Sequence, residues 1–280
     1  MASPNQHRKQ RIASLAPSAT SILVALGARR QLVGVSKWCA DVAKVGRLPR
    51  LGDCWSLDAR QVMRLKPTLV IGSVPYRQEA VAKLLEQPVA FLAMNPRTLA
   101  DVESDILLLG RLVGRENVAR KLIRRMRKDF RAIAHHGKKR STKSIENSEI
   151  GRGAPLRVYC EAWPKPRISS PPWVAELVAI AGGQMVVPAG QRVSDDDVAS
   201  AKPDVIVLAW TATGGRAKTS SALENPAWQD LPAVRNRRVY VVRDELLNTP
   251  GPPLVEGARE LARIVRSVRR ENAESRRHGA

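Results

Sequence analysis

The sequence predicts an α/β protein made of two similar lobes with parallel sheets and a long helix between them. Three observations support this prediction. Short apolar runs of strand length alternate with amphipathic stretches of helical length, and parallel strands need such crossovers. A fifteen-residue stretch of the first half recurs in similar form in the second half. Between the halves lies a helical pattern too long for an ordinary crossover.

The first lobe is predicted to span residues 11–97, after a basic tail at residues 1–10. Gly27 ends one of its helices, and Lys66-Pro67 breaks another. The predicted strands are 11–15, 31–36, 69–72 and 89–93, and the predicted helices are 20–26, 58–65 and 79–86. Residues 37–57, rich in Gly, Pro, Cys and Trp, are predicted to form a loop.

The rest of the chain is divided in the same way. The predicted regions are a linking helix at 98–136 that can break at Gly114, a flexible polar insertion at 137–155, a second α/β lobe at 156–245, and a C-terminal helix and tail at 246–280. In the second lobe we expect strands at 156–160, 205–210 and 239–242 and a helix at 173–180, and in the last region a helix at 254–270.

An internal repeat supports the division into two lobes. Residues 57–71 (LDARQVMRLKPTLVI) align without a gap onto residues 193–207 (VSDDDVASAKPDVIV), at an offset of 136 residues. The pair Lys66-Pro67 falls on Lys202-Pro203 in this alignment. Self-similarity at this distance predicts two equivalent units.

Positive charge is concentrated in one segment of the chain. The net charge is +21, and residues 109–143 hold thirteen Lys and Arg against two acids. Apolar residues recur there at helical spacing, so the basic side chains belong to the opposite, solvated face. Such a face is usually a solvated surface, although attraction to nucleic acid or anionic lipid stays open. Motifs of the common nucleic-acid-binding folds are absent from the sequence.

Location is predicted from the first residues. No window of about 18 apolar residues is found, and the basic start MASPNQHRKQR is followed by neither a continuous apolar stretch nor a cleavage site. We therefore expect a cytoplasmic protein, or a periplasmic or lipid-anchored one if translation begins upstream. Cys39, Cys54 and Cys160 are odd in number and widely spaced, which predicts reduced thiols.

Catalytic and metal-binding patterns are missing. The sequence has no GxSxG, phosphate-cradling GxxxxGK or HExxH motif. The four histidines, His7, His135, His136 and His278, fall in the tails or at a helix end. We expect no enzyme, no cofactor and no metal held by protein side chains.

Tryptophans gather in the loops that follow the predicted strands, where open parallel sheets bind ligands. Indole offers a broad flat surface and one N–H donor, which suits a planar, partly apolar ligand. The candidate ligand-binding residues are Trp38, Trp55, Tyr76, Trp163, Trp173 and Trp210. The alternative for each tryptophan is a place in a lobe core, and we favour that alternative for Trp228.

Several segments together resemble a known family. The start RIASLAPSATSILVALGARRQLVGVS, the LPRLG at residues 48–52, LDARQVMRLKPTLVIG and AVRNRRVYVV are similar to the periplasmic-binding family for cobalamin and iron-siderophore chelates, the class III substrate-binding proteins. The stretches CEAWPKPRISSPPWVAELVAIAGG and NTPGPPLVEGARELA most resemble its cobalamin-binding branch.

The resemblance implies two Rossmann-like lobes joined by a backbone helix, and a monomer that binds its ligand in the cleft between the lobes. The implied ligand is cobalamin or another corrinoid. The alternatives are haem, a ferric siderophore, or an enzyme on the same scaffold that acts on a tetrapyrrole. The implied partner is the permease of an ABC transporter, unless the chain is a cytoplasmic relative of such receptors.

The resemblance also implies one acidic residue in each lobe that docks onto the permease. In the second lobe this position falls on Asp196. In the first lobe it falls on Arg60, and the nearest acid is Asp58. This departure from the family pattern puts the permease partner in doubt.

Overall fold

The computed structural model describes residues 10–142, 154–213 and 215–278, with the side chains of 136–142 and 278 left aside. The chain divides into two compact units, Met1–Arg124 and Arg125–Ala280. The boundary falls within helix α6 (Glu116–Thr142). Among the described residues, no helix carries an apolar stretch long enough to cross a lipid bilayer.

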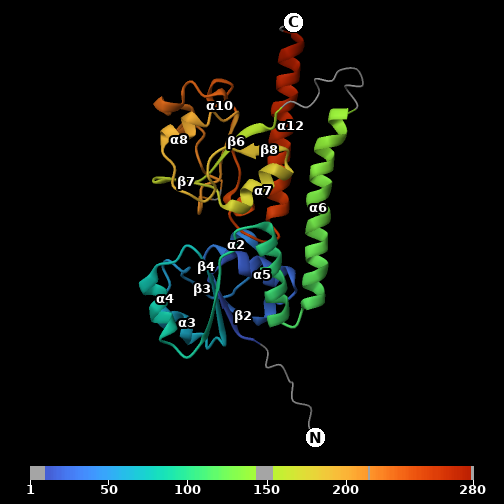
Figure 1. Ribbon diagram of the computed structural model, residues 1–280. Coiled ribbons are helices and arrows are strands. Elements are labelled where there is room, and N and C mark those ends of the chain that lie inside the picture. The colour runs from blue at the N-terminus through green and yellow to red at the C-terminus, as the bar shows by residue number, and fades with distance from the viewer. Residues whose placement is uncertain (1–9, 143–153, 214, 279–280) are drawn as a thin grey trace. The chain divides into compact units, whose positions relative to one another are not determined.

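The first unit is built on a five-stranded parallel sheet (Figure 1). Its strands are β1 (Ile12–Ser14), β2 (Leu32–Ser36), β3 (Arg50–Leu51), β4 (Leu69–Ser73) and β5 (Ala90–Met94). They lie in the order β3-β2-β1-β4-β5, and every neighbouring pair is parallel. The chain therefore builds outward from β1 in both directions, first through β2 and β3 and then through β4 and β5.

Helices cover both faces of this sheet. They are α1 (Pro17–Ala25), α2 (Cys39–Val42), α3 (Ala59–Arg64), α4 (Gln78–Leu85) and α5 (Leu99–Leu112), with a short 3-10 turn η1 (Arg29–Gln31). Leu15, Val62, Val70 and Leu84 join strands and the helices α3 and α4 in one buried cluster. Helices α1 and α5 contact each other on the other side. The predicted loop 37–57 contains α2 and β3, which are too short to give a periodic signal.

The predicted linking helix is two helices. Gly114 adopts a φ of 68°, a conformation open to glycine, and α5 ends before it while α6 begins after it. Gly110 allows the two helices to approach closely, because a Cβ atom at this position would lie 2.5 Å from the Cβ of Ala119. Helix α6 continues to Thr142, so residues 137–142 of the predicted insertion are helical. Residues 143–153 lie outside the described part.

The second unit has a mixed sheet. Its strands are β6 (Leu156–Pro164), β7 (Arg167–Ser169), β8 (Gly183–Met185), β9 (Val205–Leu208) and β10 (Val239–Val241). The order is β10-β9-β6-β7, with β8 also paired to β6. All pairs are parallel except β6 with β7, which form an antiparallel hairpin.

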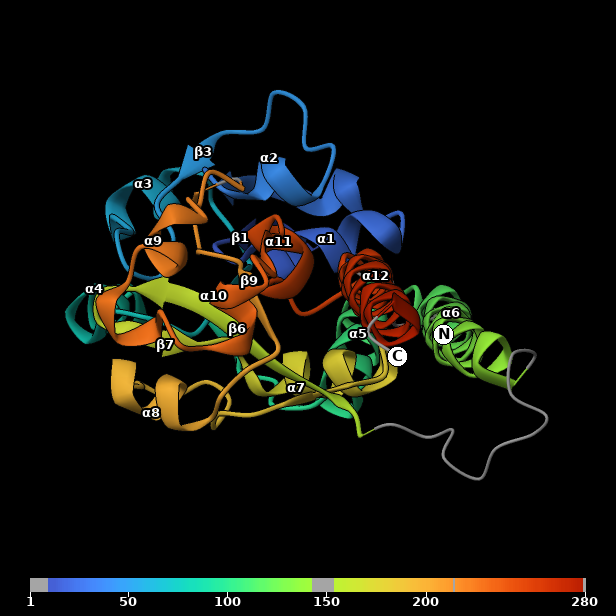
Figure 2. The same cartoon turned by 90° about the horizontal axis from the view of Figure 1, so that it is seen from above.

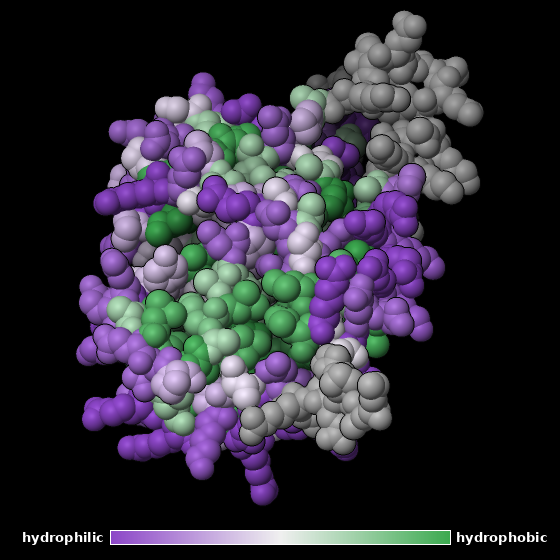
Figure 3. All heavy atoms as spheres, turned by 60° about the horizontal axis from the view of Figure 1, so that its bottom comes forward, coloured by the Kyte–Doolittle hydropathy of each residue, from purple (hydrophilic) through white to green (hydrophobic). Residues whose placement is uncertain are grey.

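The helical elements of the second unit are α7 (Pro172–Ile180), α8 (Asp195–Ser200), α9 (Ser220–Leu223), the 3-10 turn η2 (Pro226–Trp228), α10 (Pro232–Arg235), α11 (Asp244–Leu247) and α12 (Leu254–His278). Helix α12 packs on α7 and runs beside the part of α6 that belongs to this unit (Figures 1 and 2). An ion pair of 3.6 Å joins Arg259 on α12 to Asp129 on α6. Figure 3 shows that hydrophilic side chains cover the outer surface of α6.

The repeated sequence folds in the same way in both units. Lys66 and Lys202 have φ values of 46° and 40°, and each precedes the proline that leads into a buried strand. Arg11 donates from Nη2 to the carbonyl of Leu65 at 2.7 Å, and Arg157 donates from Nη2 to the carbonyl of Ala201 at 2.7 Å. In each unit an arginine from the first strand region thus caps the same helix end, and the α/β fold class is as predicted.

Candidate functional site

The strand order of the first unit identifies the edge at which open parallel sheets usually bind ligands. Because the order reverses at β1, the carboxyl ends of β1 and β4 lie at a topological switch point, where open parallel sheets bind ligands. The loops that follow β2, β3 and β4 carry Trp38, Trp55 and Tyr76. All three predicted aromatic residues of this unit therefore belong to one edge of its sheet.

Two of these aromatic side chains are open to solvent. Trp55 is 58% exposed and Tyr76 is 51% exposed, which is unusual for large apolar groups. The amide of Arg77 donates to the carbonyl of Cys54 at 3.1 Å, and this hydrogen bond ties the two aromatic loops together. The first unit therefore presents an indole and a phenol from neighbouring loops without covering either.

Trp38 is held more firmly. Its indole N–H donates to Oδ2 of Asp53 at 2.9 Å, and the ammonium of Lys37 lies 4.6 Å from its ring centre. Burial works to raise the pKa of Asp53, but hydrogen bonds from Ser56, Trp38 and the Trp55 amide lower it below its usual value. An ionised Asp53 therefore anchors the loop that carries both Trp38 and Trp55.

In the second unit, Trp163 is the exposed aromatic residue at the corresponding edge. It stands near the end of β6 with 41% of its surface exposed. Its N–H donates to the carbonyl of Lys165 at 2.9 Å, which fixes the indole against the hairpin turn. The ring remains open for contact while its polar atom is already satisfied.

Trp210 belongs to a buried polar network that the sequence did not reveal. Its N–H donates to Oε1 of Glu161 at 2.8 Å, and the hydroxyl of Tyr159 donates to Oε2 of the same carboxylate at 2.8 Å. Arg167 donates to Oε2 as well. Glu161 is fully buried, so these three donors compensate the loss of water around its charge.

Arg167 extends the network toward helix α8. It pairs with Oδ1 of Asp195 at 2.8 Å, and its guanidinium lies 4.3 Å from the ring centre of Trp228. Burial opposes its charge, but the Glu161 carboxylate outweighs this effect and holds the pKa of Arg167 above its usual value. The hairpin β6–β7, the loop of Trp210 and the start of α8 are thereby held as one rigid group.

Trp173 does not line a surface, contrary to the prediction. It is 7% exposed on the first turn of α7, and its N–H donates to the carbonyl of Leu247 at 2.8 Å. Trp228 is fully buried, as expected. Two buried polar atoms belong to residues near this contact and have no hydrogen-bond partner among the described residues. They are Oγ of Ser170, which lies shortly before Trp173, and Oδ1 of Asn248, which follows Leu247.

The two positions that the resemblance assigns to permease docking differ in charge. Asp196 is exposed on the first turn of α8, and Arg60 is exposed on the first turn of α3 with 90% of its side chain open. Asp58 caps α3, because its carboxylate accepts from the Arg60 amide at 2.9 Å. Ser194 caps α8 at the position that matches Asp58, so Asp58 is the helix cap of α3 and is not the counterpart of Asp196.

The described residues offer no cluster of three or more His, Cys, Asp or Glu that could hold a metal ion. The thiols of Cys39, Cys54 and Cys160 are buried, and burial raises the pKa of each, that of Cys160 to about 12. Protonated buried thiols are poor ligands and poor nucleophiles.

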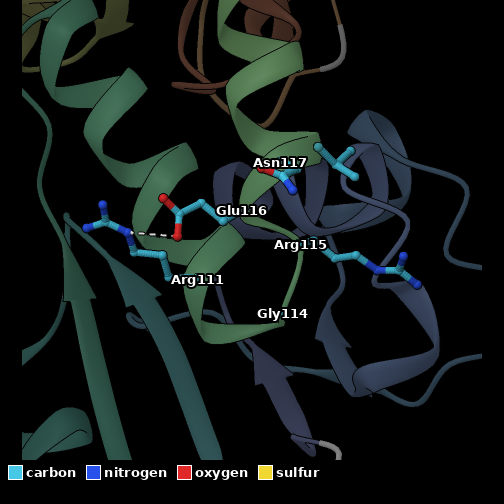
Figure 4. A pocket seen from close by; sticks show the side chains of 6 residues that line it. Arg111, Gly114, Arg115, Glu116 and Asn117 are labelled. Carbon is cyan, nitrogen blue, oxygen red and sulfur yellow. Dashed lines mark ion pairs between the residues drawn. The ribbon is translucent and has the colours of Figure 1, made fainter.

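A pocket of the first unit lies away from these aromatic loops. It is lined by residues at the turn between α5 and α6, where Arg111 pairs with Glu116 at 3.4 Å (Figure 4). Figure 4 shows Arg115 pointing away from this ion pair. None of the predicted ligand-binding residues lines this pocket.

The comparison with protein families decides the assignment. A sequence model described as periplasmic binding protein matches residues 12–246. The chain belongs to the periplasmic binding protein family. The resemblance seen in the sequence is therefore confirmed, and so is the expectation that the protein is not an enzyme, since such proteins bind solutes.

Relatives of this periplasmic binding protein match nearly its whole length. YvrC of Bacillus subtilis, an uncharacterized ABC transporter substrate-binding lipoprotein, is 28% identical over 267 residues, which cover 91% of this chain and 80% of YvrC. The vitamin B12-binding protein of Vibrio parahaemolyticus is 24% identical over 269 residues, which cover 94% of this chain and 91% of that protein.

Solved structures share the fold. A periplasmic haem-binding protein from Pseudomonas aeruginosa superposes with a TM-score of 0.76 at 23% identity, covering 90% of this chain and 91% of its own. The periplasmic vitamin B12-binding protein BtuF of Vibrio cholerae gives 0.70 at 23% identity, covering 93% and 98%. Two-lobed neighbours with both ligand types confirm the fold class and leave the ligand undecided.

The predicted cytoplasmic location is wrong. The relatives are a lipoprotein and periplasmic proteins, and such receptors work outside the cytoplasm. The prediction used only the residues that follow Met1. The relatives, which match nearly the whole chain, indicate the other location.

The residues that hold the aromatic loops were not among the predicted site residues. Glu161, Arg167 and Asp53 each place a tryptophan or its loop, yet none was predicted. The signal for Glu161 was available, because an acidic residue interrupts the apolar run VYCEAW. A charge inside a strand-like run predicts a buried, compensated carboxylate.

Proposed function

We propose that this periplasmic binding protein binds cobalamin or a closely related corrinoid as the substrate-binding component of an ABC transporter. The observation that supports the proposal most is the pair of uncovered aromatic side chains, Trp55 and Tyr76, on tied loops at the carboxyl edge of the first sheet. A flat macrocycle gains most from such a surface, since aromatic groups contribute large contact area and offset stacking.

The polar atoms of these loops fit a ligand that arrives with its metal already chelated. Trp38 and Trp163 have satisfied N–H groups, so their rings supply apolar contact. Trp163 is the exposed indole ring of the second unit. The several vitamin B12-binding relatives, each aligned over at least 90% of this chain, support a corrinoid over a ferric siderophore.

Haem is the second candidate, and Tyr76 is the observation that favours it. A phenol that is half exposed at a ligand-binding edge can serve as an axial ligand to haem iron. His135, the one histidine whose side chain is described, is exposed on α6 and follows none of the strands. Haem binding would thus depend on Tyr76, whereas corrinoid binding would depend on Trp55.

The transport role and the location follow from the same relatives. The lipoprotein YvrC carries an ABC transporter name, and we place this chain outside the cytoplasm by analogy with it. Exposed Asp196 on α8 supports docking to a permease through the second unit.

The test is a titration of the purified full chain with cyanocobalamin, haemin and a ferric siderophore, followed by tryptophan fluorescence and ligand absorbance. We expect cyanocobalamin to bind at micromolar concentration or below. Trp55→Ala should weaken that binding about tenfold or more, because one aromatic contact contributes about 1.5 kcal/mol beyond its area.

Leu85→Ala is the matched control. Leu85 is 60% exposed but ends α4, at the opposite edge of the sheet from the aromatic loops, so its removal should leave binding unchanged. If haemin binds instead and Tyr76→Phe abolishes its Fe(III)–phenolate absorbance, the haem alternative replaces the corrinoid. Absence of binding by all three ligands would refute the proposal.

A further inference from the structure

Helix α6 carries a strip of cations on its outer face. Lys121, Arg124, Lys128 and Arg131 follow one another at spacings of three and four residues and are all exposed. Arg125 stands beside them and is exposed too. We refer to these five residues as the basic strip. At 1.5 Å per residue it extends roughly 15 Å along the helix.

The basic strip has no compensating acid within the described residues. Glu116 is engaged by Arg120 at 2.5 Å and by Arg111 at 3.4 Å, and Asp129 points to the α12 side, where it pairs with Arg259. No ion pair or hydrogen bond joins a side chain of the strip to another described residue. Like charges three and four residues apart weaken a helix, so this arrangement costs stability unless anions lie nearby.

The opposite face of α6 is already covered. Ala119, Met126 and Ile133 are buried with exposed fractions of 0%, 3% and 9%. The helix therefore cannot turn its apolar side toward a membrane interior. Any contact made by the strip is electrostatic and lies at a surface, which distinguishes it from an inserting amphipathic helix.

We propose that the basic strip is a contact surface for an anionic phospholipid bilayer. A straight row of long, flexible cations on a rod-like helix matches a flat sheet of negative head groups. Lipoprotein and periplasmic relatives indicate a location beside such a surface. This role is independent of the chelate and of the permease.

RNA is the competing anionic partner, and the strip lacks what RNA binding uses. Single-stranded nucleic acid gains much of its affinity from bases stacked on aromatic side chains. The one Phe, Tyr or Trp residue on α6 is Phe130, which is half-buried and lies on the covered side of the helix. The strip offers charge without a stacking surface.

The expected strength is moderate. Each Lys or Arg near an anionic surface strengthens binding about fivefold, so loss of four such charges should weaken it by a few hundred-fold. The interaction should also fall steeply with salt, because screening shortens the reach of exposed charges. Such binding is reversible and comparable with that of a single lipid chain.

The test is co-sedimentation of the full chain with vesicles of phosphatidylcholine containing about one third phosphatidylglycerol, against pure phosphatidylcholine. The strip variant carries Lys121→Gln, Arg124→Gln, Lys128→Gln and Arg131→Gln. The control variant loses the same charge at scattered exposed positions, through Arg30→Gln, Lys44→Gln, Arg47→Gln and Lys83→Gln. Circular dichroism of both variants checks that the helices remain.

We expect the unmodified chain and the control variant to sediment with anionic vesicles at low salt and to be released at about 0.5 M salt. The strip variant should stay in solution. Equal losses in the two variants would show that net charge acts without the strip and would overturn the proposal. So would absence of vesicle binding by the unmodified chain, or tighter binding of a fluorescent single-stranded RNA than of the vesicles. Chelate titrations of the strip variant keep this outcome separate from the proposed ligand function.

Discussion

Trp210 and Glu161 are joined by a hydrogen bond of 2.8 Å from the indole N–H to a fully buried carboxylate. A tryptophan at the carboxyl end of β9 is thus fixed by a charge that has no contact with water. The charge is balanced by Arg167, which also reaches Asp195 on α8. The position of Trp210 and the position of the start of α8 therefore depend on the same few atoms.

Replacement of Glu161 should therefore be costly. Glu161→Gln leaves the guanidinium of Arg167 with a weaker partner in a site where it is 17% exposed, and should lower the free energy of unfolding by about 3 kcal/mol. Urea denaturation of the full chain measures this change. Trp210→Phe, which removes one hydrogen bond from the network, should cost only about 1 kcal/mol. If Glu161→Gln is as stable as the unmodified chain, the charge of Glu161 does not stabilise the second unit.

Asp105 on α5 should make stability depend on pH. Its Oδ2 is buried without a partner among the described residues, and burial, assisted by the charge of Asp101, raises the pKa of Asp105 to about 6. The unfolded chain loses this proton near pH 4 and the folded chain near pH 6, so stability falls as pH rises between these values.

Asp105→Asn removes this titration. Relative to the unmodified chain, the variant should gain about 1 to 2 kcal/mol at pH 7, after allowance for partial exposure, and little at pH 4. Chemical denaturation across this pH range gives both curves. A difference that stays constant with pH would show that the carboxyl of Asp105 does not ionise as described.

The close approach of α5 and α6 at Gly110 can be tested by compensation. Gly110→Ala would bring two Cβ atoms to 2.5 Å, and we expect a loss of about 1 to 3 kcal/mol. Ala119→Gly removes the opposing methyl group and alone should cost about 1 kcal/mol, as glycine does inside a helix. The double variant should be more stable than the sum of the two losses predicts. Strict additivity would show that these positions do not touch.

Lys66 and Lys202 should respond alike to substitution. Both occupy the left-handed region, which disfavours residues with a Cβ atom by about 1 to 2 kcal/mol. Glycine relieves this strain but adds freedom to the unfolded chain, so Lys66→Gly and Lys202→Gly should each raise stability by up to about 1 kcal/mol. Lys66→Val and Lys202→Val should lower it. Thermal unfolding of the four variants checks whether the two positions behave as a pair.

Much of the fold could be predicted because strands and helices leave periodic signals. The apolar runs that became β4 and β9 are each bounded by a proline turn, and the repeat around Lys66 and Lys202 predicted two similar units. Helix α2 and strand β3 were missed, since elements of two to four residues show no period. Gly114 allowed a break in the long helical pattern, and the folded chain has two separate helices there.

The candidate site was predicted less well because exposure is a tertiary property. Trp163 and Trp173 both follow strand β6 in sequence, yet one ring is open and the other is buried under a hydrogen bond to Leu247. Local sequence cannot separate them. The role of Asp53 also needs the folded geometry to be seen, because its partner Trp38 belongs to a different loop.

Helices α3 and α8 both start with a capping side chain at the matching position, but the second residue is Arg60 in one and Asp196 in the other. A protein that binds the chain at both positions cannot do so through two identical surfaces. It would have to present a cation to Asp196 and a carboxylate to Arg60. The chain would then bind it in one orientation only.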